Sequence, residues 1–233
     1  MKAHCLRLLI CTATFGLMID IASAAPIVFS GVDPGANSFN PRPNSDAAAA
    51  AFDGACAKGP CKLSVENFEA SPVGPFNTLV IASGVTLIGP QEIRNTPLAN
   101  PDGLSGYNTT SGGHDFLSLF GGDVTFIFDP SICAFGAYIS GVQLFGETIT
   151  FFDGTSETVP IANSSFGVQF LGFTDFMGGG ISSLSIHAVN DIIGIDDIRF
   201  CKCSPGQVAE PVSLALIGLG LAALGAARCR RAQ

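Results

Sequence analysis

The sequence contains no tryptophan and only two tyrosines, although 19 phenylalanines make it rich in apolar aromatic side chains. Without indole rings the chain lacks the broad amphipathic surfaces that tryptophan supplies at binding sites, which weighs against a strong lectin. Tyr107 and Tyr138 are the only polar aromatic residues. If the protein binds a sugar, we therefore expect the binding to depend on one of these two tyrosines.

Histidine is also scarce, and so are the motifs of catalysis. Of the three histidines, His4 lies in the N-terminal segment, His114 lies in a glycine-rich turn and His187 follows an apolar stretch. The sequence has no G-x-S-x-G nucleophile elbow, no H-E-x-x-H helix and no phosphate-binding loop ending in G-K-[ST]. We therefore predict that the protein is not an enzyme. A secreted hydrolase that uses two paired acids is the less expected alternative.

Basic residues are few and lie mostly at the two ends of the chain. The sequence has 11 Lys and Arg against 19 Asp and Glu, which gives a net charge of −8. Two of the 11 lie in the first segment and three in the last, so the body between them carries a net charge of about −11. This charge excludes nucleic acid as a partner, and it provides carboxylates for a hard cation such as Ca²⁺.

The N-terminus has the pattern of a signal peptide. Lys2 and Arg7 form a basic region, residues 8–19 are mostly apolar, and the small residues Ala22-Ser23-Ala24 follow. This order is typical of a cleaved secretory signal, so we assign residues 1–24 to it and expect the body to be exported.

The C-terminus ends with an apolar segment followed by arginines. Residues 212–227 contain no charge, and as a helix these 16 residues span about 24 Å, less than the ~30 Å of a bilayer core. Arg228, Arg230 and Arg231 follow and are expected to stay on the cytoplasmic side. We predict a short single membrane helix whose N-terminal side faces out of the cytoplasm.

This tail resembles a PEP-CTERM sorting signal, which consists of a Pro-Glu-Pro motif, a short apolar helix and an arginine cluster. The motif is Ala209-Glu210-Pro211 here, with Ala209 in place of the first proline, and Ser213 also fits the pattern. The resemblance covers residues 205–233. It implies a Gram-negative bacterial protein that an exosortase-like membrane peptidase processes, with transient anchoring in the inner membrane before transfer to the cell surface or matrix.

Five of the eight cysteines lie in the body, where export permits disulfides. The turn-like spacer AKGP between Cys56 and Cys61 is compatible with a local disulfide. Cys133, Cys201 and Cys203 would then give one longer link and one free thiol. A zinc site is less expected, because the cysteines lack paired metal-ligand spacing.

The body contains many short β-branched and aromatic runs separated by glycine, proline or aspartate, which predict strands. Residues 25–61 are expected to be a lead-in with one short helix at 46–53, capped by Asn44 or Ser45 and ended by Gly54. The Asp153-Gly154 pair favours a hairpin turn. In the run 168–173, apolar residues at both alternating sets of positions indicate a central strand. Residues 62–204 are therefore predicted to form an antiparallel, jelly-roll-like β-sandwich whose strands include 124–128, 134–139, 148–152, 166–173, 181–186 and 193–200.

The body also resembles the β-rich ectodomains that accompany PEP-CTERM tails, in "NFEASPVG" (67–74), "GYNTTSGGHDFLSL" (106–119), "VTFIFDPSICAFGAY" (124–138), "GVQFLGFTD" (167–175) and "IGIDDIRF" (193–200). Such domains are similar to carbohydrate-binding jelly rolls, in which a Phe-Glu pair and an Asp-Asp pair meet at a structural calcium. The resemblance implies that Glu69 and Asp197 bind Ca²⁺. Adjacent strand residues such as Asp196 and Asp197 point to opposite faces, so both can reach one site only at a bulge.

These observations predict an exported structural or adhesion-type protein of the cell envelope or extracellular matrix, associated with exopolysaccharide or biofilm. The alternative is a carbohydrate-binding module that recognises an extracellular polysaccharide.

Overall fold

The computed structural model describes residues 26–58, 61–95, 106–152, 156–174 and 180–203. Nine strands and one helix follow one another along this part of the chain. The elements are β1 (Ile27–Asp33), α1 (Pro43–Lys58), β2 (Cys61–Glu66), β3 (Gly74–Ala82), β4 (Val85–Asn95), β5 (Asp115–Ser140), β6 (Thr148–Phe152), β7 (Ser156–Pro160), β8 (Val168–Thr174) and β9 (Ile181–Cys203).

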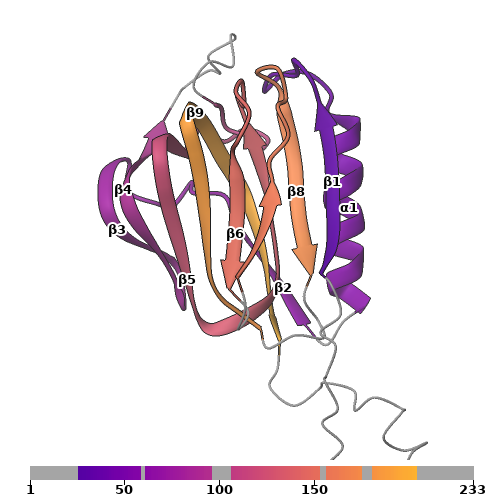
Figure 1. Cartoon of the computed structure of the whole chain (residues 1–233), viewed down its shortest axis with the longest axis vertical. Helices are drawn as coiled ribbons and strands as arrows, with labels where there is room; N and C mark the ends of the chain where they lie inside the picture. Colours follow the sequence, from indigo (N-terminus) through magenta and orange to yellow (C-terminus); the bar gives the residue numbers. More distant parts are fainter. Residues whose placement is uncertain (1–25, 59–60, 96–105, 153–155, 175–179, 204–233) are drawn as a thin grey trace, which may run out of the picture.

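All strand pairs are antiparallel, and the central path of the sheet runs β1-β8-β5-β9-β6-β7. β2 pairs with β9, and β4 joins β3 to β5. Figure 1 shows this sheet curled on itself, with α1 lying outside β1 and β8. The predicted mainly β, antiparallel architecture with one helix is confirmed.

The curl arises because β5 and β9 are long and each contributes to both halves of the sheet. Residues 117–127 of β5 pair with residues 183–195 of β9, and residues 132–140 of β5 pair mainly with residues 194–202. The two halves pack face to face around phenylalanines, with ring centroids 5.6 Å apart for Phe126–Phe135 and 6.4 Å apart for Phe128–Phe200. The main core lies between these halves, as in a β-sandwich.

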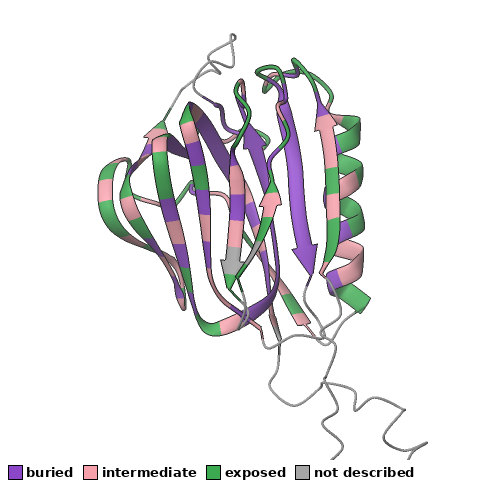
Figure 2. Cartoon of the chain, in the orientation of Figure 1, coloured by how far each residue is buried: buried purple, intermediate pink, exposed green. Residues whose placement is uncertain are grey.

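β8 is buried on both faces, which confirms its predicted central position (Figure 2). Leu171 and Phe173 belong to the main core. Phe170, on the opposite face, belongs to a second core beneath α1, where its ring lies 5.8 Å from that of Phe52. Burial of both faces explains why neither set of alternating residues in this strand is polar.

The helix lies where the sequence predicts it but is longer, and its cap differs. It begins at Pro43 and continues past Gly54 to Lys58, so the expected end at Gly54 is wrong. Asn44 and Ser45 lie within the first turn of α1, so neither is the residue that caps it. The backbone N–H groups of both residues donate to the carboxylate of Asp33, at 3.1 and 2.7 Å.

Two other expectations about strands need correction. Residues 25–43 are not simply a lead-in, because 27–33 form β1, which pairs with β8 along its whole length. The separate runs 124–128 and 134–139 belong to the single strand β5, and 181–186 and 193–200 both belong to β9. The run 148–152 is β6, as predicted, whereas β2, β3, β4 and β7 were not predicted. The Asp153-Gly154 turn lies outside the described residues, but β6 and β7 pair on either side of it.

Both predicted targeting segments, residues 1–24 and the tail 205–233 with its apolar helix 212–227, also lie outside the described residues. Within the part of the chain that is described, no helix has the length and apolarity needed to cross a bilayer.

Candidate functional site

A groove of about 400 Å³ opens at one end of the sandwich, between the segment 37–42 that precedes α1 and the segment 108–114 that precedes β5. This volume falls within the range of small-molecule binding sites, roughly 300–1,000 Å³. Most of the lining residues are polar, and they surround one large apolar ring, that of Phe39, a residue that is 68 % exposed. The lining residues are Asn37, Ser38, Phe39, Asn40, Pro41, Arg42, Asp46, Asn108, Thr109, Thr110, Ser111, Gly112, Gly113 and His114.

The two walls of the groove are joined by Arg42. Its Nε lies 3.0 Å from Asp46 Oδ1, and its Nη2 donates to the carbonyl oxygen of Thr109 at 2.7 Å. The guanidinium also lies over the ring of Tyr138, 4.4 Å from the centroid. Because Asp46 balances this cation, the groove presents no uncompensated positive charge from Arg42.

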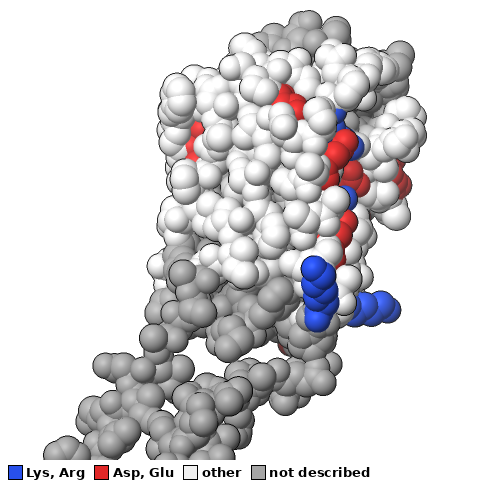
Figure 3. All heavy atoms as spheres, turned by 90° about the vertical axis from the view of Figure 1, so that its right-hand side faces the viewer, with Lys and Arg blue, Asp and Glu red and all other residues white. Residues whose placement is uncertain are grey.

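Figure 3 shows the face that carries α1, where acidic and basic side chains alternate along one side and further basic side chains lie at the lower end. No broad basic area appears among the described residues of that face. This face therefore lacks the continuous basic surface that a polyanion requires.

The wall 108–114 is anchored from below by carboxylates on two other segments. Glu69 Oε1 accepts hydrogen bonds from the backbone N–H groups of His114 and Asp115, at 2.8 and 3.0 Å, and from Asn108 Nδ2 at 2.8 Å. A Cβ on Gly113 would lie 2.2 Å from this oxygen, so any larger residue there would have to displace the Glu69 carboxylate.

Asp196 holds the middle of this wall. Its Oδ2 accepts hydrogen bonds from the backbone N–H groups of Thr109 and Thr110, at 2.7 and 3.1 Å. The residue is fully buried, and its Oδ1 has no hydrogen-bond partner. Burial, and then the negative charge of Asp197, raise the pKa of Asp196 to about 8. At neutral pH the Asp196 carboxyl therefore keeps its proton.

The two adjacent aspartates reach the same wall because the strand is irregular there. Asp197 Oδ1 accepts a hydrogen bond from Thr110 Oγ1 at 2.8 Å. Asp197 has a φ of 45°, and the register between β5 and β9 shifts between Gly136 and Tyr138, opposite this position. The structure thus contains the irregularity that adjacent strand residues need in order to face one site.

The predicted calcium ligands Glu69 and Asp197 both contact the wall 108–114, but the oxygens described above accept hydrogen bonds from it. Among the described residues, no cluster of three or more His, Cys, Asp or Glu side chains is arranged to hold a metal ion. Calcium at this position stays a prediction.

Both tyrosines are buried, so either could affect a sugar in the groove only from beneath, and the dependence of binding on them stays a prediction. The hydroxyl of Tyr107 donates to the carbonyl oxygen of Ala36, and that of Tyr138 donates to Asp46 Oδ1 at 2.7 Å. Burial raises the pKa of each tyrosine well above its usual value. The tyrosines support the groove from beneath, and the aromatic side chain open to solvent in the groove is Phe39.

Sequence reasoning overlooked Phe39 and its polar neighbours. A signal was present: in "GANSFNPRP" a phenylalanine stands between a serine and an asparagine inside a turn-rich segment. Such a segment has no strand or helix that would bury an aromatic ring. Asn37 Oδ1 accepts a hydrogen bond from the backbone N–H of Phe39 at 2.9 Å, which shapes the turn that carries the ring.

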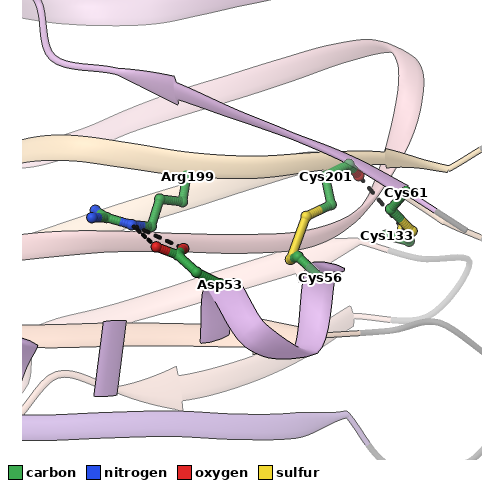
Figure 4. The surroundings of a disulfide bond; sticks show 6 residues. All are labelled: Asp53, Cys56, Cys61, Cys133, Arg199 and Cys201. Carbon is green, nitrogen blue, oxygen red and sulfur yellow. Dashed lines mark hydrogen bonds and ion pairs between the residues drawn. A yellow bond between two sulfur atoms is a disulfide. The ribbon is translucent and has the colours of Figure 1, made fainter. Parts of the chain in front are cut away.

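The cysteines pair differently from the local disulfide that the spacing favoured (Figure 4). Cys56 on α1 is bonded to Cys201 on β9, 145 residues away. Cys133 is also disulfide-bonded, and Cys61 is free, with its Sγ 3.1 Å from that of Cys133. Asp53 lies on α1 about one turn before Cys56, and its Oδ1 is 3.1 Å from Nε of Arg199 on β9. The disulfide and this ion pair together attach α1 to β9. The side chain of Cys203 lies outside the description.

No protein-family model matches the sequence, and no curated protein matches it. Among solved structures, the catalytic unit of a GH87 α-1,3-glucanase from Streptomyces thermodiastaticus is similar over 65 % of this chain, with 13 % identity and a TM-score of 0.35. The chain spans 28 % of that protein's length.

Two smaller proteins are also similar. A family 29 carbohydrate-binding module matches 66 % of this chain and 97 % of its own length, with 12 % identity and a TM-score of 0.32. The module TmCBM61, solved with β-1,4-galactotriose, matches 60 % and 95 %, with 11 % identity and a TM-score of 0.28. These similarities are too weak to assign a ligand or an activity.

Proposed function

We propose that the protein is an exported, jelly-roll-like domain that binds a neutral carbohydrate in the groove between segments 37–42 and 108–114. The observation that carries the proposal is the composition of this groove. It combines one exposed aromatic ring, Phe39, with the amides of Asn37 and Asn40 and with hydroxyl groups. Sugars present apolar C–H faces that pack on aromatic rings, and hydroxyls that pair with amides and other hydroxyls.

The charge balance favours a neutral sugar over an acidic one. Arg42 is paired with Asp46, and the whole chain carries a net charge of −8. A uronate or phosphate group would therefore find no free cation on Arg42 and would be repelled by the overall charge. We also propose binding without turnover, because Glu69 and Asp196, two carboxylates under the groove wall, hold backbone amides of that wall.

A glycan array and isothermal titration with the neutral polysaccharides it identifies would test this proposal. Phe39→Ala should weaken binding about tenfold, equivalent to ~1.4 kcal/mol. Phe152→Ala, which removes a ring that is 48 % exposed on β6, is the matched control and should bind like the wild type. Absence of binding to any neutral glycan, or equal affinity of the Phe39→Ala variant, would overturn the proposal.

We further propose export and sorting through the tail, as the PEP-CTERM resemblance implies. The disulfide between Cys56 and Cys201 supports export, because such bonds persist in oxidising compartments. The proposed role is then that of an envelope or matrix protein that holds polysaccharide near the cell. Mass spectrometry of the C-terminus, with and without an exosortase-like enzyme in the host, tests the sorting step. An intact Gln233 in both cases would refute it.

A further inference from the structure

An exposed apolar surface lies beside the groove, at the same end of the sandwich. It consists of Leu144 and Phe145, which follow β5, and Phe166, which precedes β8; we call these three residues the apolar platform. Phe145 is 83 % exposed, the highest value among the large hydrophobic side chains described, and the other two are 45 % and 39 % exposed. Figure 2 shows the connections at this end of the sheet as largely exposed.

The backbone under Leu144 and Phe145 is held by a buried carboxylate. Asp191, 4 % exposed, accepts hydrogen bonds at Oδ2 from the backbone N–H groups of Gln143 and Leu144, at 2.8 and 3.1 Å. Asn163 Nδ2 donates to the carbonyl oxygen of Gln143, which ties this connection to the one that carries Phe166. Phe145 therefore projects from an anchored backbone.

Phe166 is presented at a conformational cost. Ser165 and Phe166 have φ values of 48° and 65°, in the left-handed region that residues with side chains rarely adopt. Hydrogen bonds hold this shape: the N–H of Phe166 donates to the carbonyl oxygen of Val142, and the N–H of Ser165 donates to Asn163 Oδ1. Backbone strain combined with an exposed aromatic ring is characteristic of binding surfaces.

One segment connects this platform to the groove. The backbone N–H of Gly35 donates to the carbonyl oxygen of Ser164 at 3.1 Å, and a Cβ on Gly167 would lie 2.2 Å from the carbonyl oxygen of Asp33. The same segment then continues into residues 37–42, the first wall of the groove. The platform and the groove therefore flank opposite ends of residues 33–42.

We propose that the apolar platform extends the groove, so that the ligand is a long neutral polysaccharide chain bound along its length. This inference rests on the proposed function and specifies its substrate class. The connections 141–147 and 161–167 contain one charged residue, Glu147, which is buried, so the platform offers apolar contact without charge. The lack of basic residues there, with the net charge of −8, disfavours an anionic lipid surface as the occupant.

The test uses a length series of oligosaccharides cut from whichever neutral polysaccharide the full-length protein binds, measured by isothermal titration. Wild-type affinity should rise as the chains outgrow the groove. Phe145→Ala should bind the shortest ligands like the wild type and the longest about tenfold more weakly, the effect expected of one lost aromatic contact. Phe152→Ala is again the control, and unchanged melting temperatures establish that both variants fold.

The possible outcomes separate the two proposals. If short oligosaccharides bind but affinity is independent of length, or Phe145→Ala changes nothing, the platform proposal fails and the groove proposal stands. If no oligosaccharide binds at any length, both fail. Binding of the wild type to phosphatidylcholine vesicles that is lost in Phe145→Ala would overturn the polysaccharide assignment of the platform in favour of a lipid surface.

Discussion

The disulfide between Cys56 and Cys201 should supply a large part of the stability of this domain. It closes a loop across a sequence separation of 145 residues, and the loss of chain entropy in the unfolded state corresponds to about 5 kcal/mol for a loop of that length. In a domain of this size, 1 kcal/mol shifts the melting temperature by roughly 2–4 °C. The double variant Cys56→Ala/Cys201→Ala should therefore melt about 10–20 °C below the wild type.

Urea unfolding of the double variant under oxidising conditions measures this effect directly. Cys61→Ala is the matched control, because Cys61 is a free thiol and its removal breaks no covalent link. Reduction of the wild type should destabilise it at least as much as the double variant, because reduction also opens the disulfide of Cys133. A loss below ~1 kcal/mol in the double variant would refute this account of how α1 is held to β9.

Three further predictions concern the acids. Because the pKa of Asp196 is raised to about 8, the native state keeps a proton that the unfolded state loses near pH 4. Stability should then fall as the pH rises from about 4 to 8, by at most ~1.4 kcal/mol per pH unit. Asp196→Asn should flatten this slope in urea titrations at several pH values, and an unchanged slope contradicts the raised pKa of Asp196. For Asp33, burial alone would raise the pKa, but hydrogen bonds from Ser45 and Asn44 outweigh it and hold the pKa below its usual value. The Asp33 carboxylate therefore stabilises the folded state at neutral pH, and this stabilisation is lost as the pH falls through the lowered pKa. Asp33→Ala should lower the free energy of unfolding by ~1–2 kcal/mol at pH 7. Equal stability of the variant and the wild type would contradict the role of Asp33 as the helix cap. If Ca²⁺ binds at Glu69 and Asp197, millimolar Ca²⁺ should raise the melting temperature of the wild type but not of Asp197→Asn, whereas an unmoved wild-type melting curve removes the site.

Local features of the fold could be predicted from the sequence because they depend on short-range patterns. Apolar residues at both alternating sets of positions in 168–173 identified a central strand, since a strand covered on both faces buries residues of both sets. The alanine-rich run after Ser45 identified the helix. Its true beginning was not predictable, because the cap is Asp33, a side chain from a preceding strand.

The bending of β5 and β9 could not be predicted in the same way. Each looked like two strands, since the apolar runs are interrupted near Pro130 and Asn190. Whether such an interruption ends a strand or only bends it depends on pairing with residues far away in the sequence. The same limit applies to Cys56, whose spacing to Cys61 favoured a local bond while the fold places Cys201 beside it.

The candidate site was hidden for a related reason: its two walls are about 70 residues apart in the sequence. Tyr107 and Tyr138 were chosen as candidates because of their residue type. Both are buried and support the groove through hydrogen bonds of their hydroxyl groups, a role that residue type does not distinguish from contact with a ligand. Phe39 has no polar side-chain atom and was not predicted as a site residue. Because it is exposed and the two tyrosines are buried, it is the better candidate for contact with a sugar.

The position of the groove bears on how the proposed tail would present it. The second half of β5 runs from Ile132, beside Lys202, to Ser140, which accepts a hydrogen bond from the N–H of Tyr107 under the groove. Eight residue steps separate these points, or roughly 27 Å of strand. The described chain thus ends, at Cys203, at the opposite end of the sandwich from the groove (Figure 1).

A tail that holds the protein at a membrane, as the PEP-CTERM resemblance implies, would leave the groove and the apolar platform directed away from the lipid, where a polysaccharide chain can reach both. This orientation requires the body to be outside the cytoplasm. A reporter fused after Pro205 should therefore be active only in the periplasm, and activity confined to the cytosol would contradict export, sorting and access to the polysaccharide together.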